Sequence, residues 1–226
     1  MRTVDVNPAL PLVGGASDEA WLFDTRARDG DPAALDDVAL AAGRPVLVGV
    51  PGDVRDLEPR WRQYRAAGAP AVLRLFPGLG GHGYPLEPWA ISPVPEFAER
   101  EDLALLIEMG STGPAFPWSE VVRFARDYPR LPMMALGAPL GGTVAGRALE
   151  TAPNLLFDTS GLVRSEMRAF ATLVGTHGAF RFAFGSAGAD LGMALIADVL
   201  GEGEAQAVAA GTADEIAEGK WGARHL

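Results

Sequence analysis

Short apolar runs alternate with amphipathic, helix-like stretches along most of the chain, and this alternation limits the fold more than any other feature. Apolar runs of about four to eight residues that end in turn-forming residues are typical of buried parallel strands. Eight such runs occupy residues 3–7, 21–25, 45–50, 71–76, 103–108, 132–136, 155–158 and 181–185. Helix-like segments occupy residues 32–42, 53–67, 94–101, 118–128, 143–151, 164–176 and 189–200. The alternation predicts an α/β fold, a (β/α)8 TIM-like barrel.

The gap between the first two predicted strands departs from this pattern. Residues 8–20 are rich in Pro and Gly and are too few for a normal helix with its loops, so we expect a barrel without its first helix. We expect residues 1–226 to form a single barrel domain, in which residues 201–226 are a C-terminal helix and tail.

Composition excludes several classes of function. The chain has no cysteine, which excludes disulfides, thiolate metal sites and cysteine nucleophiles. The formal net charge of −10 disfavours nucleic acid and anionic membranes as partners, because phosphate binding needs clustered Lys and Arg. No long apolar segment or signal-peptide pattern is present. We therefore expect a cytoplasmic protein with neither a nucleic-acid nor a membrane partner.

Phrases at the ends of the predicted strands carry a resemblance to a known family. The most specific are LRLFP at 73–77 with HGY at 82–84, and DTSG at 158–161. Together with residues 4–9, 105–110, 128–132 and 184–186, they resemble the amidohydrolase-related (amidohydrolase 2 type) metal-dependent hydrolases of TIM-barrel fold. The resemblance covers roughly residues 3–200, and it implies a relative of small-acid decarboxylases and lactone hydrolases.

This chain departs from that family at the metal-ligand positions that the resemblance implies. Asn7 and Ala9 stand where the first strand has His-x-His, and Glu108 stands at the histidine of the fifth strand. Gly137 and Ala187 replace the histidine of the sixth strand and the aspartate of the eighth. A catalytic divalent ion needs about three or more suitable protein ligands. The resemblance therefore implies a degenerate member with no metal site and no cofactor.

His82 and Glu108 are the predicted catalytic residues. Glu108 ends an apolar strand, where partial burial suits a general acid or base. His82, in a Gly-rich loop, is the histidine best placed for proton transfer, although loop histidines also serve packing. Arg74 lies between Leu73 and Leu75, so its side chain is expected inside the barrel. There it either clamps a substrate carboxylate or forms a structural ion pair with Glu108 or Asp158.

The other predicted substrate-binding residues are Asn7, Asp158, Ser160 and Ser186, all at strand ends. Asp158 has a second interpretation, because Asp at a strand end often caps the next turn. The small-residue turn that begins at Gly185 and Ser186 could also bind phosphate through its backbone N–H groups.

Three functions stay open, and whether the protein is an enzyme stays open with them. The first is a non-catalytic binding or partner subunit, a pseudoenzyme, which we favour because every implied ligand position is changed. The second is a metal-independent hydrolase or decarboxylase of a small carboxylated compound or lactone. The third is a phosphate-ligand-binding barrel. The expected partners are a small-molecule carboxylate and either a second copy or an active amidohydrolase-like relative.

Overall fold

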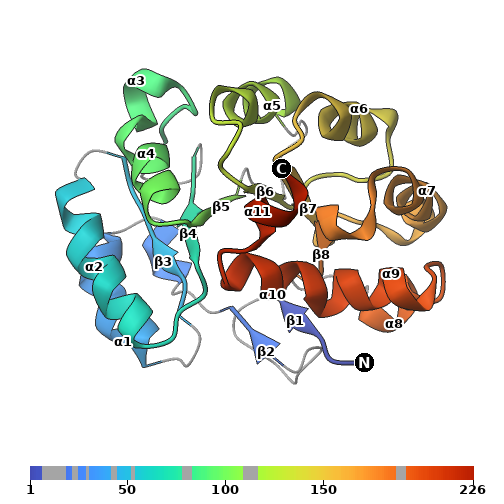
Figure 1. Cartoon of the computed structure of the whole chain (residues 1–226), viewed down its shortest axis with the longest axis horizontal. Coiled ribbons are helices and arrows are strands. Elements are labelled where there is room, and N and C mark those ends of the chain that lie inside the picture. Colours follow the sequence, from blue (N-terminus) through green and yellow to red (C-terminus); the bar gives the residue numbers. More distant parts are fainter. Residues whose placement is uncertain are drawn as a thin grey trace.

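A six-stranded parallel sheet forms the centre of the computed structural model (Figure 1). The structure describes residues 1–6, 19–21, 25–28, 31–41, 45–51, 54–77, 83–108, 117–186 and 192–226. The sheet order follows the chain: β3 (Leu47–Val48), β4 (Val72–Leu75), β5 (Ala104–Glu108), β6 (Met133–Leu136), β7 (Leu155–Asp158) and β8 (Phe182–Ala183). Parallel strands that neighbour one another in chain order define a TIM-like α/β arrangement, which confirms the predicted fold class.

Two further strands extend this arrangement beyond β8. β1 (Val4–Asp5) and β2 (Glu19–Ala20) pair in parallel, and the Val6 N–H donates to the Phe184 carbonyl at 3.0 Å. β2 begins two residues before the predicted second strand, because its pairing with β1 starts at Glu19 and ends with the Trp21 N–H on the Asp5 carbonyl. Residues 7–18 lie outside the described residues, so the predicted absence of a first helix remains a prediction.

Helices cover the outer face of the sheet, as the amphipathic pattern predicts. Alternate strand residues such as Leu73, Leu105 and Phe157 pack outward in one large apolar cluster with residues of these helices. The helices are α1 (Asp36–Leu40), α2 (Val54–Ala66), α3 (Pro88–Ile91), α4 (Pro93–Arg100), α5 (Trp118–Asp127), α6 (Thr143–Thr151), α7 (Met167–His177) and α8 (Met193–Ala197). No helix among the described residues is long and apolar enough to cross a bilayer.

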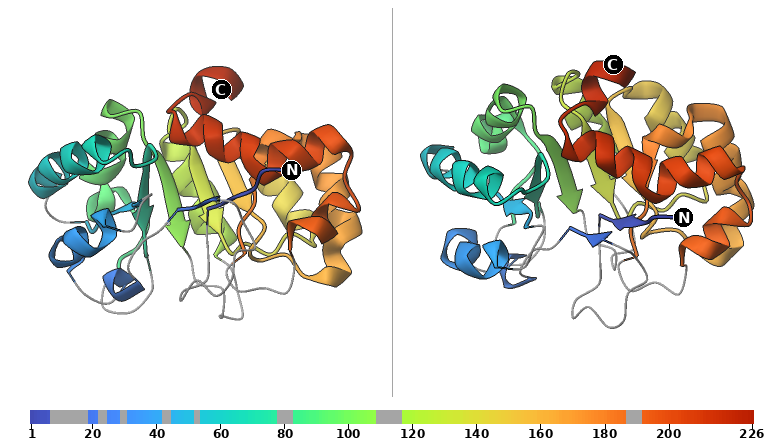
Figure 2. Two further views of the ribbon diagram at one scale, coloured as in Figure 1. Left: turned by 90° about the horizontal axis from the view of Figure 1, so that it is seen from below. Right: turned by 60° about the horizontal axis from the view of Figure 1, so that its bottom comes forward.

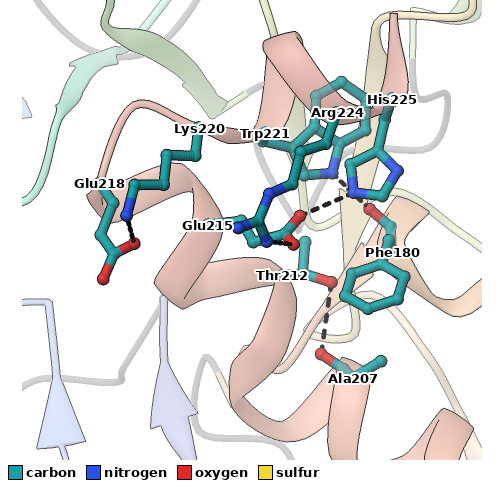
Figure 3. Close-up of polar contacts among 9 residues, drawn as sticks. All are labelled: Phe180, Ala207, Thr212, Glu215, Glu218, Lys220, Trp221, Arg224 and His225. Atoms are coloured by element: carbon teal, nitrogen blue, oxygen red, sulfur yellow. Dashed lines mark hydrogen bonds and ion pairs between the residues drawn. The ribbon is translucent and has the colours of Figure 1, made fainter.

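The C-terminal segment is packed against the barrel instead of forming a loose tail. It contains α9 (Glu202–Gln206), the π-helical turn η5 (Ala207–Gly211), α10 (Thr212–Ala217) and α11 (Trp221–His225). The Ala71 N–H, just before β4, donates to the Ala217 carbonyl at 3.0 Å. Trp221 is 1% exposed, and its indole N–H donates to the Phe180 carbonyl, just before β8, at 2.7 Å (Figure 3). This segment therefore lies at the N-terminal end of the strands (Figure 2).

Candidate functional site

Arg74 and Glu108 form an ion pair on the inner face of the sheet. Arg74 shares the inward face of β4 with Val72 and Phe76, and its Nη2 donates to Glu108 Oε2. In the strand register Arg74 lies opposite Leu106, so Glu108 is two residues closer to the C-terminal end. Arg74 is 0% exposed and Glu108 is 7% exposed. Glu108 therefore lies nearer the C-terminal end of the barrel, and Arg74 lies beneath it.

One of the two roles that the sequence left open for Arg74, the ion pair with Glu108, is present in the structure. The guanidinium carbon also lies 5.4 Å from the centre of the Phe76 ring. Arg74 is fully buried, and its role as a clamp for a substrate carboxylate remains a prediction. Arg74 is placed to orient Glu108.

Asp158 lies where the ends of three neighbouring strands come close together. It is the last residue of β7, is fully buried, and accepts a hydrogen bond from the Gly137 N–H beyond β6 at 2.8 Å. A Cβ atom at Gly185, beyond β8, would lie 2.4 Å from Asp158 Oδ2. The carboxylate thus has the capping role that was the second interpretation of Asp158. Ser160 follows it in the same turn and is partly exposed.

Ser186 is bound by a carboxylate that the sequence analysis missed. Asp5, the last residue of β1, is buried and accepts hydrogen bonds from the Ser186 N–H at 3.1 Å and from its hydroxyl at 2.6 Å. The one signal in the sequence was an acidic residue between Val4 and Val6 in an apolar run. Because the Ser186 N–H is occupied by a carboxylate, which repels anions, this turn disfavours the predicted phosphate interaction at Ser186.

Tyr84 is a further polar side chain at the same end of the barrel that was not predicted. Its hydroxyl accepts a hydrogen bond from the Phe76 N–H, directly after β4, at 3.2 Å. Burial raises the pKa of Tyr84, so the hydroxyl stays neutral at physiological pH.

The predicted site residues Asn7 and His82 lie outside the described residues, as do the implied metal-ligand positions Ala9 and Ala187. The catalytic role of His82 therefore remains a prediction. Among the predicted site residues that the structure describes, Arg74 and Glu108 are in contact, and Asp158 lies at the same end of the sheet.

The described strand ends do not fit a catalytic divalent ion. Among the described residues, no three His, Cys, Asp or Glu side chains are close enough to hold a metal. Glu108 is bound to a guanidinium, and Gly137 has no side chain to act as a ligand, while its N–H donates to Asp158. The absence of a metal site nevertheless stays a prediction, because three of the five implied ligand positions lie outside the described residues.

The loop after Asp158 gives a test of how tightly these strand ends are packed. A Cβ atom at Gly161 would lie 2.2 Å from the Ala138 carbonyl oxygen, which is backbone and cannot move aside cheaply. We expect Gly161→Ala to lower the free energy of unfolding by about 1–3 kcal/mol in urea denaturation. Gly175→Ala is the matched control: nothing lies within 4 Å of its Cβ position in α7, so it should stabilise by about 0.5–1 kcal/mol. Equal changes in the free energy of unfolding for the two variants would contradict the close packing of this loop against Ala138.

Comparison with known proteins finds similarity in structure only. No protein-family model matches the chain. No curated protein matches it. A putative 2-pyrone-4,6-dicarboxylic acid hydrolase from Pseudomonas putida superposes with a TM-score of 0.65 at 14% identity, covering 97% of this chain and 98% of that chain. A 5-carboxyvanillate decarboxylase from Sphingomonas paucimobilis has a TM-score of 0.62 at 17% identity, covering 88% of this chain and 78% of that chain.

An uncharacterised TIM-barrel protein from Bordetella bronchiseptica is a third such structure. It has a TM-score of 0.63 at 16% identity, and the superposition covers 83% of this chain and 72% of that chain. At such low identity these likenesses show a shared TIM-like α/β fold. This fold agrees with the family resemblance that the strand-end phrases carry.

Proposed function

We propose that this protein acts on a small carboxylated compound, as a hydrolase or decarboxylase that needs no bound metal. The observation that carries the proposal is the buried Arg74–Glu108 pair, which holds a carboxylate toward the C-terminal end of the barrel. Active sites of TIM barrels lie at that end. Two superposed structures support the substrate class, because their names specify a pyrone dicarboxylic acid and a carboxyvanillate.

In the proposed mechanism, Glu108 moves a proton and Arg74 is its positioning residue. For hydrolysis, Glu108 accepts a proton from the water that attacks the substrate carbonyl, while Arg74 fixes the direction of the carboxylate. The bond between the carbonyl carbon and the leaving oxygen then breaks, and that oxygen takes a proton from protonated His82, the other predicted catalytic residue. This second step requires His82 to lie within hydrogen-bond distance of the leaving oxygen.

The second candidate is a non-catalytic binding subunit. It is favoured by the hydrogen bonds of Asp5 and Asp158, because these two strand-end carboxylates hold backbone N–H groups in place. In that case the C-terminal end binds the carboxylated compound without converting it. The proposed partner is then a second copy of the chain or a catalytically active relative.

Turnover measured after chelator treatment separates the two candidates. We expect the wild type to convert one or more members of a panel of lactones and aromatic carboxylic acids. Glu108→Gln should lower kcat by about a hundredfold to ten-thousandfold, because it removes a proton-transfer group. Glu150→Gln, at an exposed carboxylate on α6, should leave kcat unchanged. Turnover that survives Glu108→Gln would reject the mechanism, and binding without any turnover would establish the second candidate.

A further inference from the structure

A groove lies in the helix layer, away from Glu108. It has a volume of about 520 Å³ and is lined by residues from the start of α7 and from α8 and the residues that follow it. Arg164 and Arg168 line one side, and Leu195, Asp198 and Val199 line the other. The α7 side begins with the 3₁₀ turn η3 (Arg164–Glu166), six residues after the end of β7. The groove is therefore separate from the Arg74–Glu108 pair, which lies on the inner face of the sheet.

The two arginines of this groove differ from most others in the described chain. Arg60, Arg123 and Arg147 each form an ion pair with a carboxylate. Arg164 and Arg168 are exposed, and neither guanidinium has a hydrogen bond or ion pair with any described residue. They are four residues apart, which places them on one side of the helical segment. Two adjacent unpaired cations on a chain of net charge −10 form a local site for an anion.

The apolar side chains of the groove indicate that the rest of the ligand is apolar. Met167 is buried against the groove, and Leu195 and Val199 expose part of their surface to it. Asp198 on the α8 side repels a negative group and so directs it toward the arginines. We propose that the groove binds a small amphipathic anion, an apolar compound that carries carboxylate or phosphate groups. Guanidinium groups bind both of these anions through paired N–H donors.

Calorimetric titration of the full-length protein tests this site. One arm uses benzene-1,3-dicarboxylate and the other uses phenyl phosphate, so the two anion chemistries are compared directly. We expect the wild type to bind at least one probe. Arg164→Ala/Arg168→Ala should weaken that binding by about tenfold or more, because charge-assisted hydrogen bonds are lost. Arg65→Ala/Arg126→Ala is the matched control, since these two arginines are also exposed and have no described partner.

The outcomes are distinct for this site and for the proposed active site. Glu108→Gln should leave the arginine-dependent binding unchanged, whether or not the protein has any turnover. Thermal unfolding of each variant confirms that the fold is intact, and Arg164→Lys/Arg168→Lys should recover part of the binding. If the two double-alanine variants bound the probe equally weakly, the loss of net positive charge alone would explain the effect, and the proposal would be overturned. No binding of either probe to the wild type would also overturn it.

Discussion

Arg74→Met is expected to lower the free energy of unfolding by about 3–5 kcal/mol. The substitution leaves the Glu108 carboxylate 7% exposed with its guanidinium partner removed. A buried charge that loses its partner keeps the full penalty of desolvation, whereas the intact pair offsets part of that penalty. Urea denaturation followed by circular dichroism measures the change.

A second substitution separates the ion pair from simple loss of packing. Arg74→Met/Glu108→Leu removes both charges, so it should recover most of the lost stability. Arg147→Met is the control, because its pair with Glu150 is exposed and worth less than about 1 kcal/mol. A loss below about 1 kcal/mol in Arg74→Met would contradict the assignment of the pair as a buried tie between β4 and β5.

Trp221→Ala is expected to destabilise the protein by a similar amount, about 3–5 kcal/mol. The Trp221 side chain is 1% exposed and belongs to the inner apolar cluster with Ala210, Ala213 and Ile216. Its removal leaves a cavity at the N-terminal end of the strands and an unpaired carbonyl at Phe180. The His225 ring, 5.2 Å away, would lose one of its two ring neighbours and keep the other, Phe180 (Figure 3).

Trp89→Ala is the matched control for this experiment. Trp89, on α3, is 81% exposed, so its removal should change stability by less than about 0.5 kcal/mol. Guanidinium denaturation should show one transition for the wild type, because the C-terminal segment is part of the inner core. A small effect of Trp221→Ala, or a separate early transition in the wild type, would contradict this packing.

The fold could be predicted because the strands of the central sheet are buried on both faces, and such strands appear in the sequence as short apolar runs. Six of the apolar runs contain the strands of the central sheet, and α6 coincides with its predicted range 143–151. β2 was predicted two residues late, because the apolar sequence after Ala20 outweighed the pairing partner that β1 provides. The packing of residues 201–226 could not be foreseen, since it depends on contacts with Ala71 and Phe180, which are distant in sequence.

One part of the candidate site follows from the sequence, and the other part follows only from the tertiary structure. Period-two alternation in the sequence determined that Arg74 faces inward and that Glu108 ends a strand, and it offered their pairing as one alternative. Only the tertiary structure decided that Arg74 lies beneath Glu108, that Asp158 caps Gly137, and that Asp5 binds Ser186. Alternation determines which face a side chain takes, but the depth of a side chain and its partners depend on strand register and on neighbouring strands.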